Sequence, residues 1–180
     1  MAEFAIETDR LILRDWRDAD LEPFHAMSND VRVMETLGPL MDRDRVRATI
    51  DRMRDEQRRN GHCFWALERR EDAQFLGWCG IIRGNAPTVA GKPEIGWRLA
   101  HHAWGQGYAR EAAQASLDWG WANLSDDCIW AITTPGNMRS WGLMERLGMT
   151  RHTDLDFDHP NVPEGSPLKA HITYSIARPC

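Results

Sequence analysis

The sequence lacks any apolar run close to the roughly 20 residues that a membrane-spanning helix needs. Its first seven residues, MAEFAIE, carry acids where a secretory signal peptide would carry basic residues, so we expect a cytoplasmic protein. Cysteine is scarce, and the four residues show no CxxC pair or ligand-like spacing. We therefore predict no bound metal, and reduced, mostly buried thiols at Cys63, Cys79, Cys128 and Cys180.

An excess of positive charge is also missing, because 22 Lys and Arg residues face 27 Asp and Glu residues, for a net charge of −5. Nucleic-acid binding requires clustered excess Lys and Arg, so this balance argues against a nucleic-acid partner and favours small or cationic ones. No repeat or low-complexity linker interrupts the 180 residues, whose 42% hydrophobic and 27% charged content is typical of globular chains. We predict a single domain over residues 1–180.

Local sequence patterns predict alternating strands and helices. Leu11–Leu13 is a short apolar run between charges, as in a strand, and the polar stretch Arg69–Asp72 separates two apolar runs, as in an antiparallel hairpin. Val46 and Ile50 recur at helical spacing before Asn60-Gly61, a typical helix stop. The predicted strands cover 9–16, 62–68, 74–83, 93–100, 128–134, 149–158 and 168–177, and the predicted helices cover 18–27, 41–60, 108–122 and 137–147. This order indicates an α+β (mixed α/β) sheet protein with a crossover connection.

The segment over 102–109, HAWGQGYA, lies between a predicted strand and a predicted helix. Its glycines let successive backbone N–H groups point at one concavity, and the helix N-terminus adds unpaired donors and the positive end of its dipole. The segment therefore suits a pyrophosphate, although glycines before a helix also occur in simple turns. A dinucleotide fingerprint would need glycine where Arg110 stands, and no P-loop lysine follows.

A second segment, TPGNMRS over 134–140, opens the helix predicted over 137–147. Asn137 and Ser140 are three residues apart and so share a helix face near the N-terminus. Asn137 also fits a plain N-cap after a Pro-Gly turn, and Gly148 fits a helix stop. The pattern alone leaves both interpretations open.

Together, and in this order, the two segments resemble the Gcn5-related N-acetyltransferase (GNAT) superfamily. Nearly the whole chain is similar to its Rim-type subgroup, the ribosomal-protein N-terminal acetyltransferases, whose opening is similar to TDRLILR over 8–14. EIGWRL over 94–99, followed by WGQGYAREA over 104–112, resembles the superfamily's acetyl-CoA motif. The stretch over 137–149 resembles its second motif. The resemblance implies an enzyme that moves the acetyl group of acetyl-CoA to a primary amine.

The resemblance also implies the GNAT fold, a central, mostly antiparallel sheet flanked by helices. This sheet splays open between the strands at 93–100 and 128–134, and acetyl-CoA occupies the gap. Gly96, inside an otherwise good strand, suggests a β-bulge that would bend this strand away from its neighbour and leave N–H groups unpaired. The pantetheine arm can then pair with the open edge like an added strand.

The residues expected to hold acetyl-CoA follow from the same resemblance. Asn137 is assigned to the pantetheine and Ser140 to the neighbourhood of the sulfur. His102 stands where the superfamily prefers Gln or Arg, and an imidazole that titrates near neutrality would make CoA affinity pH-dependent. Backbone contacts with the thioester arm are assigned to Trp97, Arg98 and Leu99. Pyrophosphate contacts are assigned to Gly105, Gln106, Gly107, Tyr108 and Ala109.

Acetyl transfer needs a base for the amine, donors for the carbonyl oxygen and an acid for the departing thiolate. Glu94 is the first candidate base, against the alternative of a strand-edge charge in solvent. Many superfamily members carry a general-acid Tyr one turn after Ser140, but this chain has Met144. The resemblance therefore leaves Ser140 as the donor to the sulfur, or as a hydroxyl with no chemical role. Rival bases are Asp156, Asp158, His159 and His171.

The acceptor is the least defined partner. Acids that gather after the second motif border the acceptor side in this architecture, so they favour a cationic amine or form a solvated loop. These acids are Asp154, Asp156, Asp158 and Glu164. Three functions stay open: an acetyltransferase for protein N-termini, one for small amines, and a non-catalytic CoA-binding sensor or partner-binding module. A homodimer is one alternative for the oligomeric state, because relatives with exposed late strands often pair.

Overall fold

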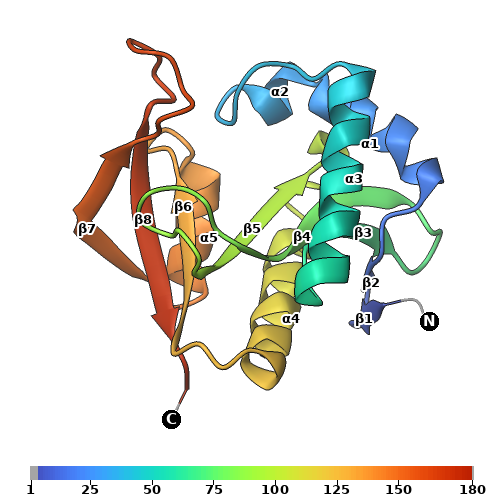
Figure 1. Ribbon diagram of the computed structural model, residues 1–180. Coiled ribbons are helices and arrows are strands. Elements are labelled where there is room, and N and C mark those ends of the chain that lie inside the picture. The colour runs from blue at the N-terminus through green and yellow to red at the C-terminus, as the bar shows by residue number, and fades with distance from the viewer. Residues whose placement is uncertain (1–3, 180) are drawn as a thin grey trace.

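The computed structural model describes residues 4–179, which contain one eight-stranded sheet (Figure 1). In chain order the strands are β1 (Ala5–Glu7), β2 (Leu11–Arg14), β3 (Phe64–Arg69), β4 (Phe75–Arg83), β5 (Pro93–Leu99), β6 (Cys128–Thr133), β7 (Thr150–Asp158) and β8 (Ala170–Ala177). They lie in the order β1-β2-β3-β4-β5-β6-β8-β7. Neighbours are antiparallel except β5 and β6, which are parallel and therefore need a crossover connection.

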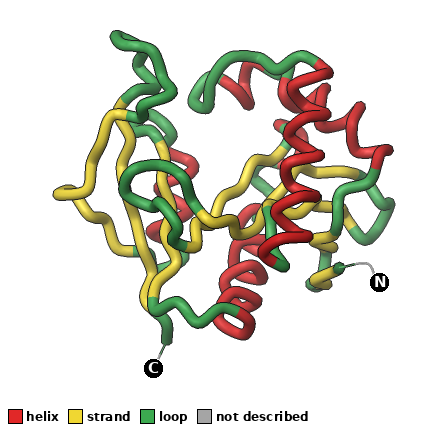
Figure 2. Tube along the Cα trace, viewed as in Figure 1, coloured by secondary structure: helices red, strands yellow, loops and turns green. Residues whose placement is uncertain are grey.

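Helices cover both faces of the sheet. They are α1 (Leu21–Ser28), α2 (Val31–Met34), α3 (Arg43–Asn60), the crossover helix α4 (Tyr108–Asn123) and α5 (Met138–Arg146). On one face, Ser116 of α4 contacts Cys79 of β4, with 3.5 Å between Oγ and Sγ. On the other face, the ring of Phe24 in α1 lies 6.3 Å from the ring of Phe75 in β4. In Figure 2, α1–α3 gather over the half of the sheet that contains β1–β4, and β7 and β8 lie at its opposite end.

The predicted fold class is confirmed, and each predicted helix and strand lies within three residues of its expected bounds. Local signals explain this agreement. The Asp42 carboxylate accepts a hydrogen bond from the Arg45 amide at 2.8 Å to begin α3, and Gly61 ends that helix with a left-handed φ of +76°. The sequence prediction missed β1 and α2, which are three and four residues long. Such short elements carry too little periodicity to be recognised from sequence.

The prediction of a β-bulge at Gly96 is wrong. The pairing of β4 with β5 continues through Gly96, which lies opposite Gly80, without a register shift. A Cβ atom at Gly96 would come within 2.9 Å of the Phe64 ring, so this glycine makes room for an aromatic side chain. The expected gap is present for another reason: β5 and β6 pair only at Glu94 and Trp130.

The cysteines within residues 4–179 are free thiols, as predicted. Cys63 and Cys79 are buried, and this burial raises the pKa of both thiols, that of Cys79 to about 12. Neither is therefore a thiolate near neutral pH. Cys180 and residues 1–3 of the acidic start lie outside the described residues. None of the helices within 4–179 has both the length and the apolar character required to cross a bilayer.

Candidate active site

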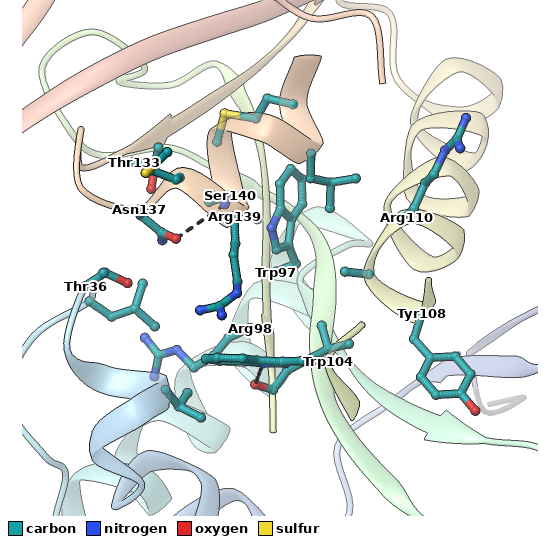
Figure 3. Close-up of a pocket in the computed structure, with 18 of the residues that line it drawn as sticks. Thr36, Trp97, Arg98, Trp104, Tyr108, Arg110, Thr133, Asn137, Arg139 and Ser140 are labelled. Atoms are coloured by element: carbon teal, nitrogen blue, oxygen red, sulfur yellow. Dashed lines mark hydrogen bonds between the residues drawn. The ribbon is translucent and has the colours of Figure 1, made fainter. Parts of the chain in front are cut away.

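A cavity of about 1010 Å³ lies where β5 and β6 separate (Figure 3). Its walls come from α2 and the following loop, from β5, from the end of β6, and from the starts of α4 and α5. Most of the predicted site residues line this one space: Glu94, Trp97, Arg98, Leu99, Gly105, Gly107, Tyr108, Ala109, Asn137 and Ser140. The tertiary structure thus brings together two sequence motifs that are about thirty residues apart in the chain.

Hydrogen bonds at both ends of the β4–β5 ladder show which β5 residues face the cavity. Beyond one end, the Ala100 amide donates to the Leu76 carbonyl at 2.8 Å. At the other end, the Gly84 amide donates to the Lys92 carbonyl at 2.9 Å. Because such bonds recur at every second residue of an antiparallel pair, even-numbered residues of β5 turn their backbone groups toward β4. Odd-numbered residues turn theirs toward the gap.

This alternation separates the three residues predicted to hold the thioester arm. The backbone N–H groups of Trp97 and Leu99 face the gap, whereas those of Arg98 face β4 and are used in the ladder. The Leu99 carbonyl already accepts a hydrogen bond from the Trp104 indole at 2.9 Å. Within residues 4–179, β5 pairs with β6 only at Glu94, so Trp97 offers both a free donor and a free acceptor at the open edge. Arg98 contributes its side chain only.

The turn before α4 aims backbone amides at the same cavity. Gly105 and Gly107 have φ angles of +73° and +81°, a conformation that strongly favours glycine. Within residues 4–179, the amides from Gly107 to Arg110 have no hydrogen-bond acceptor, as expected at a helix start. The helix dipole adds positive potential there, so this turn is suited to bind an anion.

Two residues predicted at the pyrophosphate do not line the cavity. His102 is exposed to solvent, and its carbonyl accepts a hydrogen bond from Gln106 Nε2 at 2.8 Å. The Gln106 carbonyl in turn accepts from Arg10 Nη1 at 2.9 Å. The Gln106 side chain therefore holds the turn from outside the cavity, and the His102 side chain does not reach the cavity.

The start of α5 forms the opposite wall of the cavity. Asn137 is its N-cap, as one interpretation of the sequence predicted, and its Oδ1 accepts from the Ser140 amide at 3.3 Å. This bond leaves the Asn137 Nδ2 group free to donate to a ligand. Ser140 is half-buried, and its hydroxyl has no hydrogen-bond partner within the described part of the chain. Both side chains lie together in Figure 3.

Burial changes the acidity of Glu94, which lines the cavity from β5. Its carboxylate has no hydrogen-bond or ion-pair partner among residues 4–179, and it lies beside Gly84. Loss of solvation therefore raises the pKa of Glu94 to about 7, from an ordinary value of 4.5. A carboxylate with this pKa can accept a proton near neutral pH and release it again.

The sequence also matches a family model, described as an acetyltransferase (GNAT) domain, over residues 10–150. The chain belongs to the GNAT acetyltransferases. The uncharacterized protein YkkB of Bacillus subtilis is 33% identical to it over 149 residues, which cover 82% of this chain and 86% of YkkB. Family membership identifies the chain as an N-acetyltransferase and confirms the resemblance seen in its motifs.

Solved GNAT structures share the fold at lower identity. The spermidine N-acetyltransferase from Vibrio cholerae, in complex with CoA and spermine, has a TM-score of 0.73 at 17% identity and covers 95% of this chain and 97% of its own. The ribosomal-protein-S5-alanine acetyltransferase from Vibrio fischeri has a TM-score of 0.75 at 15% identity, with 97% of both chains covered. These two structures show that the chain shares the GNAT fold.

Against this GNAT fold, the rival bases lie apart from the cavity. Asp156 pairs with Arg151, at 2.6 Å between carboxylate and guanidinium. The rings of His159 and His171 lie 4.9 Å apart on the β7–β8 hairpin. These residues and Asp158 do not line the cavity, whereas Glu94 does.

Among the lining residues that the sequence prediction missed, three basic residues and one aromatic residue lie within the two motifs. Arg110, Arg139 and Arg146 line the cavity, and the Arg139 guanidinium lies 4.6 Å from the centre of the Trp104 ring (Figure 3). Trp104 is in turn held by its bond to the Leu99 carbonyl. All four lie within the motifs over 104–112 and 137–149. The basic residues of these motifs were therefore the sequence signal that could have identified the arginines as part of the site.

Proposed function

We propose that this enzyme, acting as a single domain, transfers the acetyl group of acetyl-CoA to a primary amine by direct attack in a ternary complex. The observation that carries the proposal is the cavity between β5 and β6. It joins an open strand edge, the free amides of the α4 start, the polar start of α5 and a carboxylate of raised pKa. These are the groups that a long, phosphorylated thioester and an attacking amine require.

The cavity residues fit the parts of acetyl-CoA in order. The amides of Gly107 to Ala109 and the α4 dipole suit the pyrophosphate, with Arg110 and Arg139 adding positive charge. The Asn137 Nδ2 group and the gap-facing edge of Trp97 suit the amide-bearing pantetheine arm. The bound thioester supplies an activated acetyl group.

Three residues then have chemical roles. Glu94 accepts a proton from the ammonium form of the acceptor, directly or through water, so that a neutral amine can attack. The Trp97 N–H stabilises the negative charge that develops on the acetyl oxygen. After the amine nitrogen has bonded to the acetyl carbon, the C–S bond breaks and the Ser140 hydroxyl gives its proton to the departing sulfur, which leaves as CoA thiol. The Ser140 oxygen recovers a proton from the nitrogen, directly or through water, so that the neutral amide forms.

Turnover of amines tests the proposal directly. The two solved relatives are named for acetylation of spermidine and of a ribosomal protein, so both small amines and peptide N-termini belong in the test. Release of CoA thiol should accelerate well above hydrolysis with at least one amine. Tight CoA binding without transfer to any amine would instead support the non-catalytic CoA-binding module.

Replacing Gly107 by Pro tests the pyrophosphate site. Proline removes one amide donor and cannot adopt the φ of +81° found here, so we expect acetyl-CoA to bind at least about tenfold more weakly. Calorimetric titration gives the affinity. The matched control is Gly165→Pro, which makes the same change at a φ of +78° in the β7–β8 loop. Equal affinities for both variants would refute the assignment.

Replacing Ser140 by Ala tests the sulfur donor. We expect kcat to fall about 100-fold, because the thiolate then leaves without a proton donor. The affinity for acetyl-CoA should change little, since the Asn137 cap uses the amide of residue 140 and not its hydroxyl. Pre-steady-state rates separate the two quantities, and an unchanged kcat would remove Ser140 from the mechanism.

A further inference from the structure

A second cavity, of about 450 Å³, adjoins the first on the face of the sheet that α1 and α3 cover. Phe64, Trp78 and Arg98 line both cavities, so they form the wall between them. Apolar side chains from several elements line most of the second cavity, and Phe24 and Met53 are buried among them. It is therefore an apolar pocket that opens beside the site where the acetyl group would lie.

The polar groups of this second cavity have one sign of charge. Arg45 and Arg52 lie seven residues apart on α3, on the same helix face, and Arg98 reaches the cavity from β5. Its lining contains no aspartate or glutamate. Across residues 4–179, no carboxylate lies within 4 Å of these three guanidinium groups, although other arginines of α3, such as Arg54, form ion pairs.

Arg98 is the most constrained of the three. Its Nε atom is buried and has no hydrogen-bond partner in the described part of the chain, and its Nη1 atom donates to the Met41 sulfur at 3.8 Å. The guanidinium lies 5.4 Å from the centre of the Trp78 ring. Burial, followed by repulsion from Arg45, lowers the pKa of Arg98 to about 10. A buried guanidinium without an anion is unfavourable for folding, so a bound anion would be stabilised here.

We propose that the second cavity binds the acceptor, and that this acceptor is a primary amine carrying a carboxylate beside an apolar or aromatic body, as in an apolar α-amino acid. The carboxylate pairs with Arg98 and Arg45, and the apolar body packs against Phe24 and Trp78. The amine then points toward Glu94, on the same face of β5. This inference rests on the proposed acetyl transfer and names its substrate class.

The same structure removes the support for a cationic acceptor. The acids that favoured it lie outside both cavities, and two of them pair with basic neighbours, Asp156 with Arg151 and Glu164 with Lys169. A polyamine would also place its charges against Arg45 and Arg98. The second cavity thus selects against polycations and for an anionic group.

Matched amines that differ only in the carboxylate test this inference. The pairs are phenylalanine with phenethylamine, tryptophan with tryptamine, and methionine with 3-(methylthio)propylamine. We expect kcat/KM to be about 10- to 100-fold higher for the amino acid in at least one pair, because charge-assisted bonds to guanidinium groups are strong. Dissociation constants measured by calorimetry on the CoA-bound enzyme should show the same preference.

Arginine variants test whether the preference for a carboxylate arises in the second cavity. In Arg98→Gln and in Arg45→Gln, the ratio of kcat/KM between the members of the best pair should fall about tenfold. Arg47→Gln is the matched control, since Arg47 is an exposed α3 residue outside the cavity. Melting temperatures show whether each variant folds. Because Arg45 is exposed, Arg45→Gln should fold and can still test the inference if Arg98→Gln does not.

The outcomes separate this inference from the proposed function. If the decarboxylated amines react and bind as well as the amino acids, the anionic acceptor is refuted while acetyl transfer stands. Unchanged ratios in both arginine variants would refute it as well. If the amino acids bind tightly but no amine is acetylated, the anion site is supported and the proposed catalysis fails.

Discussion

Glu94→Gln should lower kcat/KM about 100-fold or more at pH 8, because the acceptor amine then loses its proton acceptor. In the unmodified enzyme, kcat/KM should rise with pH through an apparent pKa near 7, as the Glu94 carboxyl group ionises. This step should be absent from the variant. Steady-state rates between pH 5.5 and 9 measure both effects, with Glu71→Gln, an exposed turn substitution, as the control.

Glu94→Gln should lower activity but raise the stability of the fold. The pKa of Glu94 is about 7 in the folded chain against an ordinary 4.5, so the folded state holds this proton more tightly between these pH values. The stabilisation that the protonated Glu94 carboxyl group gives the folded state is therefore present below pH 4.5 and is lost as the pH rises through 7. Glu94→Gln should be more stable than the unmodified enzyme at pH 8, by up to ~3 kcal/mol.

Urea unfolding at pH 4.5 and pH 8 measures this difference. Little difference is expected at pH 4.5, where the carboxyl group is largely protonated in the folded chain. A variant that is inactive but equally stable at both pH values would show that Glu94 is solvated and charged. The raised pKa would then be excluded as the basis of its role.

Arg14→Met should lower the free energy of unfolding by ~3–5 kcal/mol at pH 7. The buried Arg14 guanidinium donates two hydrogen bonds of 2.9 Å to Asp20 and one of 2.8 Å to Glu68. Removal of the cation leaves both carboxylates buried without their main partner, although Arg17 lies 3.4 Å from Glu68 and its amide donates to Asp20 at 2.7 Å. Denaturant unfolding measures the loss.

An exposed ion pair gives a matched comparison for this loss. Arg43→Gln, which removes an exposed pair with Glu22, should cost less than ~1 kcal/mol. If both substitutions lower the free energy of unfolding equally, the buried network stabilises the fold no more than an exposed ion pair does. Because this network joins β2, β3 and the start of α1, its loss should also weaken acceptor binding.

The success of the sequence prediction for the α4 start has a local cause. Gly105 and Gly107 need left-handed backbone angles before a helix, and this requirement is visible in the order of residues alone. The Asn137 cap was predictable for the same reason. Gly96 shows the limit of such arguments, because its role depends on the ring of Phe64, which is distant in sequence.

The acceptor side shows the same limit more strongly. The clustered acids of the tail gave a visible sequence pattern, yet Asp156 and Glu164 form local ion pairs outside both cavities. The arginines that define the second cavity come from α3 and β5, and Arg45 has no distinguishing pattern within a helix rich in arginine. Only their shared position reveals a cavity with unopposed positive charge.

The sequence by itself determined the elements other than β1 and α2, their order, the family and the two motifs of the cofactor side. These features depend on backbone conformation and helix termini, which neighbouring residues control. The tertiary structure decided which β5 residues face the gap, the raised pKa of Glu94 and the charge of the second cavity. These properties depend on strand register, burial and distances between remote segments, and such quantities exist only once the chain has folded.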